Sequence, residues 1–204
     1  TLKGYRNISD DDVNVLIAER QSTELITIEK IKEVADFAIS KGIAVASHDD
    51  DNIQKLELVK SFGTTISEFP ITLEVAQKAK EIGLHTIAGA PNVMLGGSHS
   101  GNLSAVEAIA NDCVDILCSD YYPAALLHAI FDLHEKYDND LHKMFMMVTL
   151  NPAKAVRMDD ELGSIKVGKK ADILVIERME DGYPMLTATM VNGALITTTH
   201  YRIK

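Results

Sequence analysis

One pattern occurs four times between residues 43 and 137: a short apolar run, a polar loop, and a segment with helical periodicity. The apolar runs are IAVAS (43–47), TTISEF (64–69), HTIA (85–88) and VDILC (114–118). A helix that connects two strands of one sheet places those strands parallel. The chain is therefore predicted to be an α/β protein, built either on a (β/α)8 barrel or on an open doubly wound sheet.

Two helices are predicted before these four units. The first covers 9–20, with Ser9 as its N-cap and three aspartates in its first turn. The second covers 27–40, carries an apolar stripe at helical spacing, and ends at Gly42. In the fourth unit, Pro123 is suited to the first position of a helix that runs to residue 137.

The chain changes character after two further predicted helices at 140–149 and 152–158. GSIKVGKKADILVI (163–176) predicts two short strands around a turn, and Asn192-Gly193 predicts a type I′ hairpin. We therefore expect residues 1–158 to form the (β/α) part with its two leading helices. Residues 159–204 form a small C-terminal β segment that buries too little surface to fold alone.

Composition excludes several kinds of partner. The chain has 20 Lys and Arg against 30 Asp and Glu, a net charge of −10, so it lacks the basic field that nucleic acids or anionic membranes require. No apolar run approaches the roughly 20 residues that span a bilayer, and TLKGYRNISDDD is not a signal peptide. We expect a cytoplasmic protein whose two cysteines, Cys113 and Cys118, are free thiols.

The loop GAPNVMLGGSHSGN (89–102) follows the third apolar run and carries no formal charge. Glycines allow successive backbone amides to face one anion, and a helix predicted to start near Leu103 adds a favourable dipole. The loop is therefore a candidate phosphate site, although a Gly-rich connection with only a conformational role has the same composition. The residues proposed to contact substrate here are Asn92, Gly97, Ser98, His99, Ser100 and Asn102.

Histidine and acidic residues stand where strands are predicted to end. His48 follows the first apolar run; its imidazole can bind a divalent metal, with Asp49 as a supporting or ligating carboxylate. Asp120 follows the fourth run and can bind metal and accept a proton from an activated water. Both positions also suit the cap of the next helix, and SHDDD taken alone is more typical of that role.

Two weaker candidates complete the predicted site. Glu68 in SEFP is an additional carboxylate, with a solvated strand-end residue as the alternative. Tyr121 and Tyr122 are adjacent, so only one of them is expected to face the site, and Tyr121 is the candidate for substrate contact.

The C-terminal pattern GSIKVGKKADILVI followed by VNGALI resembles the signature of the amidohydrolase superfamily, metal-dependent hydrolases on a (β/α)8 barrel. Four further motifs resemble the PhnM family of phosphonate catabolism, the α-D-ribose 1-methylphosphonate 5-triphosphate diphosphatases. They are ASHDD (46–50), SEFP (67–70), GAPNVMLGGSHSGN (89–102) and SDYYPAALL (119–127). The resemblance runs in order from Ile43 to Ile196.

This resemblance implies the C-terminal half of a (β/α)8 (TIM) barrel of amidohydrolase type with a small β-sandwich portion. The implied reaction hydrolyses a phosphorylated ribose phosphonate, the 5-triphosphate, to the 5-phosphate and pyrophosphate in the carbon-phosphorus lyase pathway. His48 matches the superfamily's fifth-strand metal ligand, and Asp120 matches the eighth-strand aspartate, a metal ligand and proton acceptor. Glu68 stands where a second histidine is usual. The implied cofactor is a divalent metal, zinc first, with manganese or magnesium as alternatives.

The chain also departs from the superfamily pattern. The first-strand metal motif and strands one to four would precede Thr1, so we expect the isolated chain to be inactive and to lack part of the metal site. A half-barrel has open strand edges, and a homodimer is one way to cover them. Two alternative functions stay open: a hydrolase of C–N bonds, such as a deaminase or cyclic amidase, and a non-catalytic half-barrel binding module.

Overall fold

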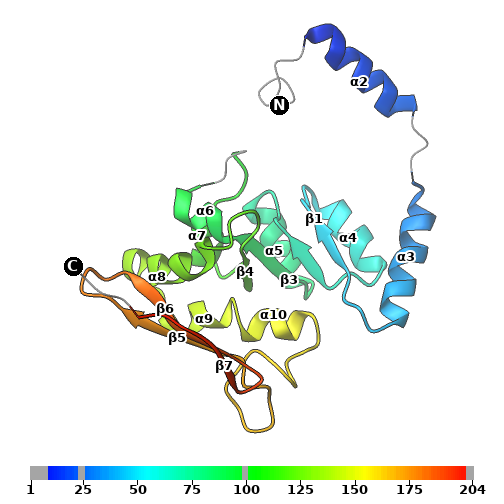
Figure 1. The fold of residues 1–204 in the computed structure, drawn as a ribbon. Helices are drawn as coiled ribbons and strands as arrows, with labels where there is room; N and C mark the ends of the chain where they lie inside the picture. The colour runs from blue at the N-terminus through cyan, green and yellow to red at the C-terminus, as the bar shows by residue number, and fades with distance from the viewer. Residues whose placement is uncertain (1–8, 23–25, 98–100, 201–204) are drawn as a thin grey trace.

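A four-stranded parallel sheet organises the fold. The computed structural model describes residues 9–22, 26–97 and 101–200 (Figure 1). The strands are ordered β1 (Ala46–His48), β2 (Ile66–Glu68), β3 (His85–Gly89) and β4 (Ile116–Cys118), and each pairs in parallel with the next. Helices connect them, which confirms the predicted α/β class and the βα order. These helices are α4 (Ile53–Ser61), α5 (Leu73–Glu81), α6 (Ala90–Leu95) and α7 (Ala105–Ala110).

Polar side chains cap the N-termini of three of these helices, α4, α5 and α7. Asn52 accepts a hydrogen bond from the Lys55 N–H at 2.8 Å, and Thr72 accepts one from the Val75 N–H at 3.3 Å. Such contacts satisfy backbone donors that have no partner inside the helix. The same chemistry begins α2 (Asp10–Ser22) at Ser9, the predicted N-cap, and α3 (Ile28–Ser40) at Thr27.

Three helices follow β4: α8 (Ala125–Tyr137), α9 (Leu141–Met146) and α10 (Leu150–Ala155). The prediction that Pro123 begins α8 is wrong by two residues, because 123–124 form a turn that precedes the helix. The two later helices are shorter than predicted. Asp140 begins α9 by accepting a hydrogen bond from the Lys143 N–H at 2.9 Å.

A second sheet is antiparallel and contains β5 (Ile173–Arg178), β6 (Pro184–Val191) and β7 (Ala194–Thr198). The predicted hairpin turn is confirmed, since Asn192 and Gly193 both have positive φ, 49° and 79°. The strand predicted before residue 170 is wrong: residues 163–172 form bends, a turn at 167–168 and irregular backbone. Ile165 and Val167 are 87% and 103% exposed, so they have no apolar surface to cover as a strand.

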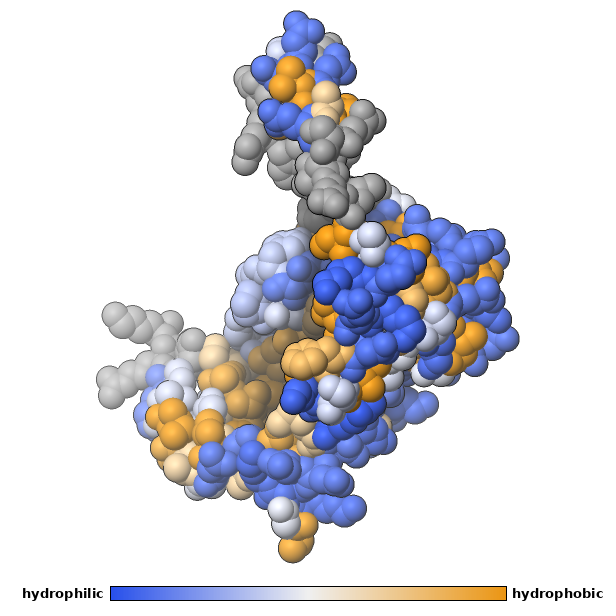
Figure 2. Space-filling model, turned by 90° about the vertical axis from the view of Figure 1, so that its right-hand side faces the viewer, coloured by the Kyte–Doolittle hydropathy of each residue, from blue (hydrophilic) through white to orange (hydrophobic). Residues whose placement is uncertain are grey.

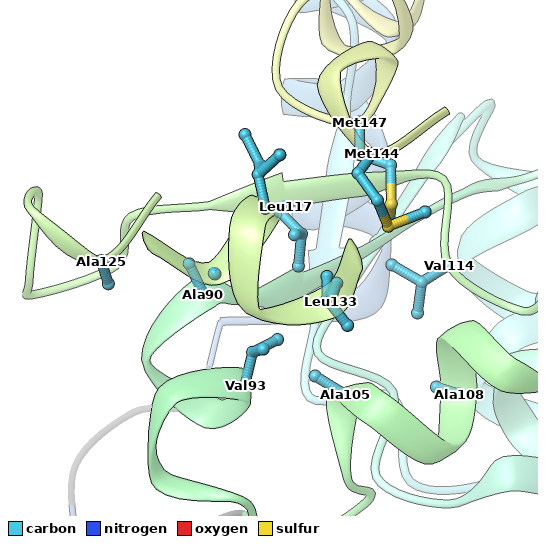
Figure 3. Close-up of a cluster of buried hydrophobic side chains, with 12 residues drawn as sticks. Ala90, Val93, Ala105, Ala108, Val114, Leu117, Ala125, Leu133, Met144 and Met147 are labelled. Atoms are coloured by element: carbon cyan, nitrogen blue, oxygen red, sulfur yellow. The ribbon is translucent and has the colours of Figure 1, made fainter. Parts of the chain in front are cut away.

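The largest apolar cluster lies on the β4 side of the parallel sheet (Figure 3). Leu117 of β4, Leu133 of α8 and Met144 of α9 meet Ala90 and Val93 of α6 there, and all five are at most 5% exposed. A smaller cluster holds α4 and α5 together through Leu56, Val75, Ala79 and Leu84.

The segment 89–102, predicted as one loop, contains a helix. Pro91 suits the first turn of α6, Ala90 and Val93 are buried in the cluster of Figure 3, and Gly96 ends the helix at φ 72°. The connection to α7 is therefore confined to residues 96–104. Three of the proposed substrate residues, Ser98, His99 and Ser100, lie outside the described residues.

Candidate functional site

The carboxyl ends of the four strands bring predicted site residues into one row. The register pairs His48 with Glu68, Glu68 with Ile87, and Gly89 with Cys118. Residues two apart on a strand share a face of the sheet. Glu68 and Cys118 therefore lie above Ile66 and Ile116, which pack together with Ala155 of α10.

Three strand-end turns adopt a backbone conformation that residues other than glycine rarely take. Asp49 after β1, Phe69 after β2 and Asp120 after β4 have φ of 53°, 56° and 48°. Each such residue costs on the order of 1–2 kcal/mol, and strain of this kind gathers at functional sites. Each turn changes the direction of the chain directly after its strand. The turns lie at the edge of the sheet that carries His48 and Asp120, the predicted metal ligands.

His48 is fixed on two sides. Its Nδ1 lies 3.1 Å from Asp49 Oδ2, and its ring meets the Phe69 ring edge-on at 5.2 Å between centroids. Both side chains of the His48–Asp49 pair are more than half exposed. With Nδ1 beside a carboxylate, Nε2 is the nitrogen of His48 that faces away from this contact, an arrangement typical of ligating histidines.

A cavity of about 250 Å³ lies between the strand ends and the α6–α7 connection. Gly89 lines this cavity, and a Cβ at that position would lie in ordinary van der Waals contact with Phe69 Cε1 at 3.6 Å. His48 and Glu68 are not among the residues that line the cavity. Six of the predicted site residues do line it: Asp49, Asn92, Gly97, Asn102, Asp120 and Tyr121.

Asn92 has a structural contact at each end of its amide. Its Nδ2 donates to the Leu103 carbonyl at 3.1 Å, and its Oδ1 accepts from the Ala105 N–H at 2.9 Å. These bonds tie the end of the 96–104 connection to α6. Asn92 lines the cavity, so these bonds help to shape its wall.

Two residues at this edge carry no role in the sequence analysis. Cys118 lies in the row of strand ends, and its pKa is raised, first by burial and further by the Glu68 and Asp120 carboxylates. The signal was available, because position 118 is two residues after the buried Ile116 and so lies on the same face of β4. Asp50 is fully buried and accepts hydrogen bonds from two serines. The sequence SHDDD does not distinguish it from its acidic neighbours.

The donor types at this edge fit a divalent metal, since imidazole and carboxylate groups are its usual ligands. Within the described ranges, however, no three His, Cys, Asp or Glu side chains converge on one point. His48 ends β1 and Asp120 follows β4, and these are the two outer strands of the sheet. These residues therefore fit a metal in type and supply only part of a ligand set.

Comparison with known proteins identifies the class. The profile of the amidohydrolase family matches residues 13–199, so the chain belongs to that family. An amidohydrolase from Thermotoga maritima MSB8 has the same fold, with a TM-score of 0.63, 17% identity, and coverage of 93% of this chain and 52% of that one. An adenosine deaminase from Xanthomonas campestris with bound zinc gives a TM-score of 0.61 at 15% identity, covering 83% of this chain and 49% of the other.

Among curated proteins, the chain is similar to the α-D-ribose 1-methylphosphonate 5-triphosphate diphosphatase of Escherichia coli (strain K12). The two are 39% identical over 152 residues, which is 74% of this chain and 40% of the relative. An imidazolonepropionase from Fusobacterium nucleatum is 26% identical over 174 residues, again 40% of the relative. The chain thus spans less than half the length of these relatives. Its described helices include none long and apolar enough to cross a membrane.

Proposed function

We propose that this chain contributes the active-site edge of a metal-dependent hydrolase that cleaves a phosphoric anhydride, converting α-D-ribose 1-methylphosphonate 5-triphosphate to the 5-phosphate and pyrophosphate. The observation that carries the proposal is the 39% identity with the diphosphatase, which extends over 74% of this chain. The cavity supports it, because Asp120 lines it together with a glycine and an uncharged polar residue, Gly97 and Asn102.

We also propose the architecture in which this site works. Four consecutive parallel strands and coverage of 52% of a Thermotoga maritima amidohydrolase support the C-terminal half of a (β/α)8 barrel. In this proposal the half-barrel is residues 1–158, and residues 159–204 are the C-terminal part of a β-sandwich. Such a half supplies some of the metal ligands, so the chain alone is expected to be inactive.

His48 and Asp120 are the proposed metal ligands, with Asp49 and Glu68 as additional carboxylates. A divalent ion bound there, zinc first and manganese or magnesium as alternatives, supplies Lewis-acid activation of water and of the phosphate. Asp120 accepts the proton of the attacking water. The cavity of about 250 Å³ is smaller than a typical pocket for a whole ligand, so it suits part of the triphosphate chain. The proposed phosphate contacts come from Asn92, Gly97, Ser98, His99, Ser100, Asn102 and Tyr121.

The test is product analysis of a complete enzyme that contains this sequence. Asp120→Asn should lower kcat by about 100-fold or more, the range of a lost general base, with a smaller change in KM. Asn102→Ala should mainly raise KM. Asp160→Asn removes an exposed carboxylate outside the cavity and serves as the matched control. Unchanged turnover in Asp120→Asn would show that the assigned role is wrong.

A C–N bond hydrolase is the second candidate, and the match to an imidazolonepropionase favours it. The products formed from a panel of nucleotide, cyclic amide and phosphonate substrates distinguish the two candidates. A diphosphatase releases pyrophosphate, and a C–N bond hydrolase such as a deaminase releases ammonia. A non-catalytic binding module is the third, favoured because the described side chains form no three-ligand group. That candidate predicts that neither product forms, even after the chain is joined to a complementary barrel half.

A further inference from the structure

A buried carboxylate, Asp50, and a partly exposed lysine, Lys55, form an ionic cluster after β1. Asp50 is fully buried, and its Oδ2 accepts hydrogen bonds from Ser47 Oγ of β1 at 2.6 Å and Ser67 Oγ of β2 at 2.5 Å. Its Oδ1 has no hydrogen-bond partner and lies 3.5 Å from Lys55 Nζ. A buried carboxylate is tolerated when hydroxyl donors and a cation compensate it.

The ammonium group of Lys55 donates hydrogen bonds to backbone carbonyls at the end of β1. Its Nζ donates to the His48 carbonyl at 2.7 Å and to the Asp49 carbonyl at 2.8 Å. These two carbonyls border the turn in which Asp49 has φ 53°. The Lys55 ammonium thus bridges the two carbonyls of a strained turn.

The cluster is also connected to the far wall of the cavity by backbone hydrogen bonds. The Ile71 N–H donates to the Asp50 carbonyl at 2.9 Å, and the Leu103 N–H donates to the Ile71 carbonyl at 2.9 Å. Three loops that follow three successive strands are joined in this way. The last of them carries Asn102 and is held from its other side by the Asn92 amide.

We propose that Lys55 and Asp50 are positioning residues that set the shape of the cavity: they fix the turn bearing His48 and, through Ile71 and Leu103, the connection that bears Asn102. The functional consequence rests on the proposed function, in which these residues hold metal and phosphate. The mechanical claim does not, because it concerns bonds within this chain. Neither residue touches the cavity directly.

Amide hydrogen exchange followed by NMR on the 204-residue chain tests the mechanical claim. Lys55→Met keeps the aliphatic stem and removes the ammonium, and it should speed exchange of the Asp49, Ile71 and Leu103 amides by about tenfold. The Cys113 amide, which donates to Ala108 O at 2.8 Å in another part of the fold, should keep its rate. The His48 ring signal should shift with the three amides.

Two further variants separate positioning from general stability. Lys55→Arg, whose guanidinium can donate to two carbonyls, should restore the parental rates and the His48 signal. Lys60→Met changes a lysine in the last turn of the same helix and should leave every signal in place. The proposal is overturned when Lys55→Met leaves the three amides unchanged, or when it speeds the Cys113 amide equally.

Binding of inorganic pyrophosphate distinguishes this claim from the proposed function. If the parent chain binds pyrophosphate, Lys55→Met should raise its Kd by about 10-fold, the usual effect of losing a residue that orients a ligating group. A parent chain that shows no pyrophosphate binding counts against the proposed phosphate site. The exchange rates still decide whether Lys55 positions the turn that bears His48 and the connection that bears Asn102.

Discussion

The two edges of the parallel sheet differ. At the β4 edge the Leu117 N–H donates to the Met147 carbonyl at 3.0 Å, and Asn151 Nδ2 donates to the Asp115 carbonyl at 2.8 Å. Leu117 is only 3% exposed. At the β1 edge the strand pairs with β2 alone among the described strands, and His48 is exposed. One edge is therefore covered by the segment from α9 to α10, and the other is open.

The helix that precedes β1 in the chain, α3, is also less completely packed than the helices on the β4 side. In α3, Ala35 is buried and Ile39 reaches Gly63, but Ile31, Val34 and Phe37 are 48%, 61% and 66% exposed. Figure 2 shows this side of the molecule, where apolar residues lie exposed among hydrophilic ones. An unpaired strand edge next to exposed apolar residues is a surface that another strand or chain can cover. Stability generated within the chain is concentrated on the β4 side.

The largest expected effect tests whether the stabilising contacts are concentrated on the β4 side. Leu133→Ala on α8 empties a fully buried position in the main cluster and should lower the free energy of unfolding by about 3–4 kcal/mol. Val34→Ala, on the exposed face of α3, should change it by less than about 0.5 kcal/mol. Urea unfolding measures both. Equal losses would mean that α3 is packed against something in solution, which would contradict an open β1 side.

The segment from α9 to α10, which covers the β4 edge, can be destabilised by a substitution at Gly163, where the chain turns after α10. Its φ is 81°, and a Cβ there would lie 2.8 Å from Ala153 Cβ and 2.9 Å from Leu150 Cα. Gly163→Ala should therefore cost about 3 kcal/mol from backbone strain and overpacking together. Gly168, with φ 94° and open space around it, is the matched control, and Gly168→Ala should cost about 1 kcal/mol. Equal costs in thermal unfolding would show that the Gly163 contact is not tight.

The sequence predicted the elements whose signals are local. Apolar runs followed by capped helices located the parallel strands, and Asn192-Gly193 located the hairpin. The predictions were wrong where secondary structure depends on packing against another part of the chain. GSIKV has the composition of a strand but pairs with no described strand. Ala90–Leu95 has the composition of a loop but forms a helix with a buried face. Local composition cannot report whether a neighbouring surface exists.

The candidate site shows the same limit. Position after a strand was enough to nominate Asp49, Asp120 and Tyr121, which line the cavity together. No pattern in SHDDD marks Asp50 as the aspartate that turns inward, since that follows from the positive φ of Asp49 and from serines on two strands. The spacing of residues in the sequence cannot predict a role that depends on a strained turn or on a partner far along the chain.

Hydrogen exchange tests the edge comparison at single amides. Asp49 donates to the Glu68 carbonyl on β2, and amides alternate sides along a strand, so the His48 N–H faces the open edge. We predict that the His48 amide exchanges at least about 30-fold faster than the Leu117 amide after correction for intrinsic rates, equivalent to about 2 kcal/mol of opening free energy. A protected His48 amide would show that another strand covers the β1 edge, and its dependence on protein concentration would identify a second copy.

The smallest effect concerns the thiol at the end of β4. Burial raises the pKa of Cys118, and the Glu68 and Asp120 carboxylates raise it further, while a hydrogen bond from the Asp120 backbone opposes the shift. The thiolate is the reacting form, so at a pH near the ordinary thiol pKa iodoacetamide should alkylate Cys118 several-fold more slowly than a small free thiol. The difference should shrink as the pH rises past the raised pKa.

A matched pair of variants shows whether the Cys118 thiol reports on the strand-end row. Asp120→Asn removes one neighbouring negative charge, so the pKa of Cys118 should fall and alkylation should quicken, by less than about threefold because the larger cause, burial, remains. Asp160→Asn should not change the rate. Mass spectrometry in a Cys113→Ser background follows the single thiol, since Cys113 is 3% exposed and is the other free cysteine. A rate unaffected by Asp120→Asn would place the Asp120 carboxylate away from the β4 end, and with it the proton acceptor proposed for the reaction.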